Sequence, residues 1–309
     1  MELKCKVQTY DWGRYGIDST VATLIKSSNS DFVLDEKRPY AELWIGTHPN
    51  GPSYMKDLNI SLEEYIKQNT NVLGNDVQKV FGQHLPFLFK VLSVNKALSI
   101  QAHPDKEKAR KLNQQHPTIY KDANHKPELA IALTPFEALC GFRPIREIQE
   151  FLKILPELRA VIGEDKVLKF MTTDCVECMA CSDNVVRAGL TPKLKDVPTL
   201  VEMLRYICEP ISAKRFQPSR EDECTEVFRP PVVDFAVAKI TIPPGRASYN
   251  IIPRSTASVL IIINGKGEIS PSKILYQGSV IFIPADEKVG IKVLCGCHPM
   301  LMFQAFVNV

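Results

Sequence analysis

The 309-residue sequence has no long uninterrupted run of apolar residues. No stretch approaches the roughly 18 residues that a membrane-spanning helix needs, and we therefore exclude a membrane span. The amino terminus carries charges at Glu2, Lys4 and Lys6, where a secretory signal would have its apolar stretch. We expect a cytoplasmic protein with no membrane partner.

The sequence also lacks a large excess of either charge. Its 38 basic and 35 acidic residues leave a net charge of +3 and are interspersed along the chain, which excludes a typical nucleic-acid-binding surface. The nine cysteines are an odd number. In a cytoplasmic chain they indicate reduced thiols rather than a disulfide framework. An anionic small molecule is the ligand class that this composition still allows.

Short apolar runs separated by turn residues predict a mainly β protein. Runs such as YDWGRYG, YAELWIGTHPNGPS and LPFLFKVLSV fill the first hundred residues, and the strand patterns of 235–309 suit an antiparallel sandwich or barrel of jelly-roll type. Within the first part, SLEEYIKQNT predicts a helix, because Ser61 can cap it and Glu64 follows three positions later. Further helical patterns follow Pro104 and occupy 144–170 and 199–208.

The stretch SIQAHPD carries the first candidate site. Alternation along a strand places Ser99, Gln101 and His103 on one face. A polar face turned into a small barrel is costly unless it binds water, a ligand or a metal, although a surface strand would explain the pattern equally well. In NHKPELAIAL, Lys126 and Glu128 share a face in the same way. Carboxylate and imidazole together suit zinc, and a lysine suits a phosphate, but this segment alone is also compatible with a turn.

The segment CVECMACSDNVVRAGLTPK contains two further motifs. Its cysteines at 175, 178 and 181 resemble metal ligands, but a strand would turn Cys178 away from the other two, and no fourth ligand follows. We therefore predict no cysteine metal cluster. The SDNVVRAG part brings Asp183 and Arg187 close together, either in a functional site or in a surface turn with an ion pair.

In combination and in order, these motifs closely resemble type I phosphomannose isomerases of the animal kind over nearly the whole chain. The resemblance implies cupin-like jelly-roll barrels with a helical insert in the catalytic part. It also implies interconversion of mannose 6-phosphate and fructose 6-phosphate, with one zinc ion per chain, in the supply of GDP-mannose for glycosylation. Proton transfer between C1 and C2 through an ene-diol requires a general base and a group that stabilises the oxyanion.

The resemblance also assigns residues. It implies zinc ligands at Gln101, His103 and Glu128, catalytic roles for Arg187 and Lys126, and substrate-binding roles for Lys90, Ser99, Asp183 and Lys193. We favour Arg187 and Lys193 for the substrate phosphate. The base stays open among His125, Lys126, Glu128 and a zinc-bound water.

The sequence departs from the family directly before Cys175. Most of the family's long helical domain, and its N-x-x-H-A-Y strand, which carries a fourth zinc-ligand histidine, have no counterpart here, a loss on the order of a hundred residues. None of the remaining histidines replaces it by motif. Because only one imidazole remains, we predict weak or absent zinc binding. The segment 166–171 is apolar enough to substitute for the lost strand.

The predicted organisation has four parts. A catalytic cupin-like domain begins at 1–143, a shortened helical insert spans 144–171, the catalytic domain returns at 172–210, and a jelly-roll domain occupies 211–309. We expect a monomer that acts on a sugar phosphate as an aldose-ketose isomerase. The alternatives are a catalytically silent shortened variant that only binds sugar phosphate or a partner, and a non-enzymatic cupin module.

Overall fold

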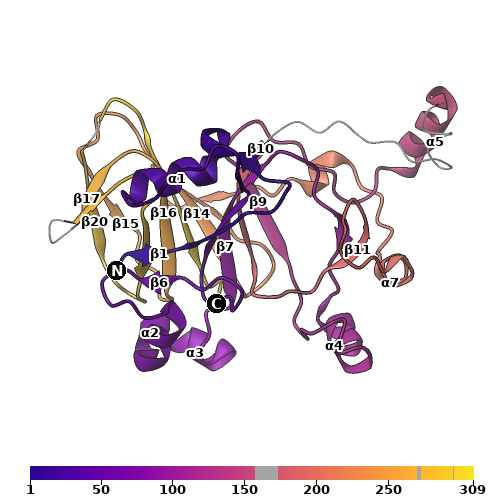
Figure 1. Cartoon of the computed structure of the whole chain (residues 1–309), viewed down its shortest axis with the longest axis horizontal. Coiled ribbons are helices and arrows are strands. Elements are labelled where there is room, and N and C mark those ends of the chain that lie inside the picture. The colour runs from indigo at the N-terminus through magenta and orange to yellow at the C-terminus, as the bar shows by residue number, and fades with distance from the viewer. Residues whose placement is uncertain (157–172, 270–272, 295) are drawn as a thin grey trace.

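The fold is mainly β, in agreement with the sequence-based prediction (Figure 1). It is seen in a computed structural model, which describes residues 1–156, 173–269, 273–294 and 296–309. The segment 166–171, which we predicted could replace a strand, lies outside the described residues, as does most of the second half of the predicted insert. The domain boundaries at residues 143, 171 and 210 stay predictions.

The chain up to Ala180 forms an antiparallel five-stranded sheet around the long strand β7 (Phe87–Val94). The strand order is β2-β5-β7-β10-β9, where β2 is Lys6–Gln8, β5 is Glu42–Ile45, β10 is Thr173–Ala180 and β9 is Glu128–Ala132. Every residue of β7 is buried, as expected for a central strand with both faces covered. β10 therefore lies beside β7 although 78 residues separate the two strands in sequence.

Three small strand pairs flank this sheet. The pair β8 (Ile100–Ala102) and β11 (Val186–Gly189) holds the SIQAHPD and SDNVVRAG motifs against each other, with Gln101 opposite Arg187. The others are β1 (Leu3–Lys4) with β6 (Tyr54–Met55), and β3 (Arg14–Tyr15) with β4 (Pro39–Tyr40). The pairing of β8 with β11 brings together polar motifs that lie far apart in the sequence.

The last part of the chain is a sandwich of two antiparallel sheets, as the strand spacing predicted. The six-stranded sheet has the order β12-β13-β14-β21-β16-β19, and the four-stranded sheet β15-β20-β17-β18. Their bounds are β12 Ser219–Arg220, β13 Thr225–Phe228, β14 Ala236–Ile242, β15 Ser248–Ile251, β16 Ser258–Asn264, β17 Gly267–Ile269, β18 Lys273–Leu275, β19 Val280–Ile283, β20 Val289–Val293 and β21 Met300–Phe306.

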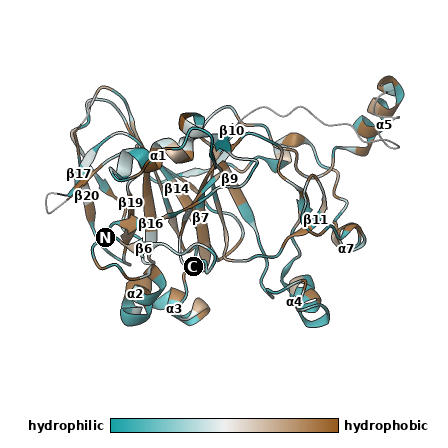
Figure 2. Cartoon of the chain, in the orientation of Figure 1, coloured by the Kyte–Doolittle hydropathy of each residue, from teal (hydrophilic) through white to brown (hydrophobic). Residues whose placement is uncertain are grey.

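Two large apolar cores hold these layers together. The larger core joins the two parts of the chain, because Phe87 and Phe89 of β7 belong to the same cluster as Phe282 and Phe303 of the six-stranded sheet. The second lies between the two sheets of the sandwich. Figure 2 shows apolar residues concentrated in the packed strands and hydrophilic residues over much of the outlying helices. Burial of apolar surface thus fixes the sandwich directly against the five-stranded sheet.

The helices are short and lie at the periphery (Figure 1). They are α1 Thr20–Ser28, α2 Leu62–Gln68, α3 Asn75–Phe81, α4 Lys106–Gln115, α5 Ile145–Ile154 and α7 Val197–Met203. The predicted cap of α2 is confirmed, since the Ser61 hydroxyl accepts a hydrogen bond from the Glu64 amide. The helix pattern of 199–208 was too long, because α7 ends at Met203. None of the described helices is long and apolar enough to cross a membrane.

Candidate active site

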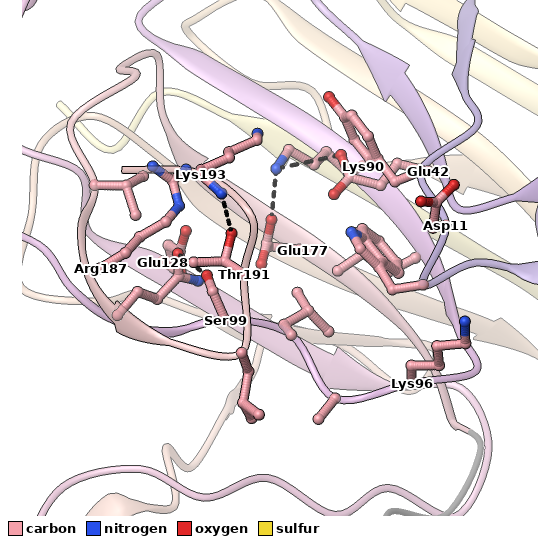
Figure 3. A pocket seen from close by; sticks show the side chains of 18 of the residues that line it. Asp11, Glu42, Lys90, Lys96, Ser99, Glu128, Glu177, Arg187, Thr191 and Lys193 are labelled. Atoms are coloured by element: carbon pink, nitrogen blue, oxygen red, sulfur yellow. Dashed lines mark hydrogen bonds and ion pairs between the residues drawn. The ribbon is translucent and has the colours of Figure 1, made fainter. Parts of the chain in front are cut away.

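A cavity of about 380 Å³ opens between the five-stranded sheet and the β8–β11 pair (Figure 3). Eight of the nine residues singled out from the sequence line it: Lys90, Ser99, Gln101, Lys126, Glu128, Asp183, Arg187 and Lys193. The ninth, His103, contacts Glu128 beside the cavity. The fold therefore collects residues from five separate segments into one polar pocket.

Buried charges form the floor of the pocket. Strands β7 and β10 pair so that Lys90 and Glu177 lie opposite each other, and the Lys90 ammonium is 2.8 Å from the Glu177 carboxylate. Glu42 of β5 lies 3.6 Å from the same ammonium. Trp44 stands beside Lys90, with the ammonium 5.5 Å from the ring centroid, and its indole donates a hydrogen bond to Glu42. One lysine thus balances two buried carboxylates.

This balance shifts the ionisation of both partners. Burial alone would lower the pKa of Lys90, but the charges of Glu177 and Glu42 outweigh it and raise the pKa. Burial raises the pKa of Glu177, and the neighbouring carboxylates of Glu128 and Glu42 add to that rise. The charge of Lys90 opposes this rise but does not cancel it, so the pKa of Glu177 stays above its usual value. A carboxyl group of raised pKa in a pocket is typical of an acid–base catalyst.

Of the predicted metal ligands, His103 and Glu128 are in contact with each other, and Gln101 and Glu128 line the pocket. His103 Nε2 is 3.3 Å from Glu128 Oε1, and the other ring nitrogen, Nδ1, is 2.7 Å from the carbonyl oxygen of Asn184. Because a carbonyl only accepts, Nδ1 carries the proton and Nε2 is free to act as a donor atom toward a metal. The Ser99 hydroxyl donates to Gln101 Oε1 at 3.3 Å.

Glu128 is held ionised by its neighbours. Burial on its own would raise its pKa, but a hydrogen bond from His103, which Nε2 donates when both ring nitrogens carry a proton, and the charge of Lys126 lower it to about 2. The Lys126 ammonium lies 3.1 Å from the Glu128 carboxylate. An ionised carboxylate and an imidazole with a fixed proton are suitable zinc ligands.

The donor chemistry of Gln101, His103 and Glu128 fits zinc, as an amide oxygen, an imidazole and a carboxylate beside an open cavity. A second imidazole is not available among the described residues, where His48 and His125 pair with Asp183 and Asp234. The other histidines, His84, His116 and His298, are exposed. Within the same part of the chain, no group of three or more histidine, cysteine, aspartate or glutamate side chains could hold a metal ion.

Two cations that line the pocket have no carboxylate partner within the part of the chain that the structure describes. Among the described residues no carboxylate lies within 4.0 Å of Arg187 or Lys193, whereas Lys90 and Lys126 are paired. Partial burial lowers the pKa of Arg187, and Asp183 partly offsets this. Lys193 sits over the ring of Tyr10 at 5.6 Å. These two cations are therefore available to an anionic ligand.

Asp183 stands at the rim and is oriented by His48. The backbone amide of Asn50 donates to His48 Nδ1, so Nε2 carries the proton and faces the Asp183 carboxylate at 3.3 Å. This hydrogen bond is the main reason that the pKa of Asp183 is lowered. His48 is buried, and the ring of Trp44 packs against it edge-on.

The sequence interpretation missed several members of the site. Glu177 and Glu42 are the most consequential, and Tyr10, Trp12 and Trp44 also line the cavity. The stretch CVEC contained a signal for Glu177, since a charged residue stands there between apolar ones in a strand. His125, one of the candidates for the base, turns away and bonds Asp234 instead.

The cysteine motif has the arrangement that alternation predicted. Cys175 belongs to an apolar cluster with Leu92 on one face of β10, and Cys178 belongs to the main core on the other face. Burial raises the pKa of both thiols. These cysteines are packing residues.

Comparison with known proteins adds independent information. Residues 1–145 match the family model described as "Phosphomannose isomerase type I, catalytic domain". A mannose-6-phosphate isomerase from Bos taurus is 37% identical over 412 aligned positions that cover 98% of this chain and 97% of the relative. Mannose-6-phosphate isomerase 1 from Arabidopsis thaliana is 33% identical, and the alignment covers 99% of this chain and 93% of the relative.

Solved structures share the fold. The apo form of mannose 6-phosphate isomerase from Salmonella typhimurium superposes with a TM-score of 0.80 at 24% identity and covers all of this chain and 99% of its own. A mannose 6-phosphate isomerase bound with zinc and yttrium gives a TM-score of 0.81, also at 24% identity. In the Bos taurus alignment, 98% of 309 residues is about 303, so roughly 110 of the 412 positions have no counterpart here. This number agrees with the predicted loss.

Proposed function

Because this chain belongs to the type I phosphomannose isomerase family, we propose that it interconverts mannose 6-phosphate and fructose 6-phosphate. The observation that carries the proposal is the convergence of the assigned residues on one cavity, which contains both unpaired cations and buried carboxyl groups. A sugar phosphate requires the cations, and proton transfer requires the carboxyl groups.

We place the substrate phosphate between Arg187 and Lys193. Both line the cavity and, within the described residues, neither has a carboxylate partner. A guanidinium group can bind two phosphate oxygens at once, and a lysine adds a point charge. Lys126 and Lys90 are already engaged by Glu128 and Glu177, so they are better suited to orient sugar hydroxyls or to stabilise an oxyanion.

For the proton transfer we propose Glu177, which the sequence-based candidates did not include. Its carboxyl group lines the cavity, and its raised pKa makes it a stronger base than an ordinary carboxylate. The Lys90 ammonium, 2.8 Å away, would stabilise the ionised form before the proton is taken. Glu128, with a pKa of about 2, is a poor base and suits metal binding better.

Gln101, His103 and Glu128 would hold the zinc ion. Bound there, zinc would polarise the carbonyl and hydroxyl oxygens of the sugar as a Lewis acid. We propose that binding is weaker than in a site with two imidazoles, because an amide oxygen is a weak neutral donor and Lys126 competes for Glu128. Gln101, His103 and Glu128 would still supply the three protein ligands that a catalytic zinc site typically has.

The test is conversion of mannose 6-phosphate to fructose 6-phosphate by the purified chain with added zinc. We expect turnover that falls by several orders of magnitude in Arg187→Ala. Arg205→Ala is the matched control, because Arg205 is exposed and bonds only Asp105 among the described side chains. Absence of turnover in the folded wild type, with zinc supplied, would contradict the proposal and favour the silent variant. Equal activity in both variants would remove Arg187 from the site.

A further inference from the structure

The carboxylate of Asp234 reaches from the sandwich to the loop that carries Lys126. Asp234 lies just before β14 and is 1% exposed, and its Oδ2 is 3.1 Å from Nε2 of His125. His125 directly precedes Lys126, which lines the active-site cavity. The pair therefore links the last part of the chain to a residue of the site.

The loop around His125 is held mainly by hydrogen bonds. The Asn184 amide donates to the carbonyl oxygens of Asp122 and Asn124 at 2.6 and 2.8 Å, and the Ser182 hydroxyl donates to Asn124 as well. These bonds fix the side of the loop that faces β11. They leave the position of the loop relative to the sandwich undetermined.

On the opposite side the loop borders open space. A second cavity of about 410 Å³ is lined by Asn124 and Asp234 together with Cys181, His84 and Pro86. Tight packing normally fixes a side chain in a core, but it is incomplete where a cavity stands. The hydrogen bond between His125 and Asp234 joins the loop to the sandwich beside this cavity. It therefore contributes more to the position of the loop than it would in a tightly packed region.

We propose that Asp234 is a positioning residue, which acts through His125 to place Lys126 against Glu128. The Lys126 ammonium and the Glu128 carboxylate are 3.1 Å apart, a distance that a small shift of the loop would change. The role of Lys126 in turnover rests on the function proposed above. Through this contact the sandwich contributes to the active site without supplying a residue that touches the substrate.

A buried ion pair can also be purely structural, and the sandwich offers a matched control. Arg254 and Glu221 form a similar pair at 2.8 Å, with the Arg254 side chain 8% exposed. Neither lines the active-site cavity. Glu221→Ala should lower the melting temperature, because the Arg254 charge is left buried, and should leave kcat/KM unchanged.

The experiment compares Asp234→Ala, His125→Ala, the double variant and Glu221→Ala. We expect each of the first two to lower kcat/KM by about 10- to 100-fold at a temperature where all are folded. The double variant should be no worse than the more affected single variant, because both remove one contact. Hydrogen exchange in 121–128 should rise in these three and not in Glu221→Ala. If Asp234→Ala does not fold, His125→Ala carries the same expectation.

Unchanged kcat/KM and unchanged exchange in His125→Ala would overturn the proposal, as would an additive loss in the double variant. The proposed function is judged separately. An inactive wild type would refute that function, whereas the exchange measurement would still decide whether Asp234 positions the loop.

Discussion

Lys90 and Glu177 lie directly opposite each other on adjacent antiparallel strands, and their charged groups are 2.8 Å apart. Lys90 is buried, and the second carboxylate, of Glu42, is within 3.6 Å. Ions removed from water are tolerated only when they compensate one another. The stability of the sheet and the ionisation of the proposed base therefore depend on the same contact.

Replacement of Lys90 by Met should strongly destabilise the protein. The substitution leaves Glu42 and Glu177 close together without a cation, and loss of one partner of a buried pair typically costs about 3–5 kcal/mol. Urea unfolding would measure the change. Lys79→Met is the control, since the Lys79 side chain is 73% exposed and its pair with Asp76 should contribute under about 1 kcal/mol. Equal stabilities of the two variants would contradict the prediction.

Removal of the His103 imidazole should weaken zinc binding. Replacement of a residue that only hydrogen-bonds a metal ligand typically lowers the metal affinity about 10- to 100-fold. Loss of the single available imidazole in the described site should lower the zinc affinity at least as much. Competition with a chelating dye would measure the affinity of the metal-free protein. His116→Ala is the matched control, because His116 is exposed. The same zinc affinity in His103→Ala and in the wild type would place the metal elsewhere.

The stability of the protein should depend on Tyr120 at high pH. Burial and then the hydrogen bond to Asp196, 2.6 Å away, raise the pKa of Tyr120 from 10.0 to about 12. A group whose pKa is raised on folding stabilises the folded state below the unfolded pKa and loses that contribution as the pH rises to the folded pKa. The stability advantage of the wild type over Tyr120→Phe should therefore be constant from neutral pH to pH 10.0 and shrink toward pH 12.

Chemical denaturation of both proteins at a series of pH values tests this expectation. The other tyrosines titrate in both proteins, so their contribution cancels in the difference. A difference in stability that does not change over this range would show that Tyr120 ionises normally in the folded state.

The cysteines of the CVECMAC motif should react slowly with alkylating reagents. The thiolate is the reactive form, and burial raises the pKa of Cys181 to about 11. Cys140 and Cys297 are exposed and should be modified first. Mass spectrometry after short treatment with iodoacetamide near neutral pH would rank the sites. Early labelling of Cys178 would show that β10 opens readily or that the motif is not packed in the core.

Much of the local structure could be predicted from residues that are neighbours in sequence. Ser61 caps α2, and Ser99 and Gln101, which alternation grouped together, both line the cavity. Helices α1 and α3 were not anticipated, because segments of nine and seven residues have few turns in which a helical period can show. The resemblance supplied the residue assignments that spacing alone left open.

By itself, the sequence determined the mainly β fold, the sandwich at the end of the chain and the polar faces of the site strands, since alternation and capping depend on residues a few positions apart. Tertiary structure decided that Glu177 faces Lys90 and that Asp234 holds His125. These pairs are separated by 87 and 109 positions. Strand register and the docking of two sheets bring such residues together, and both follow from burial of apolar surface by the whole chain.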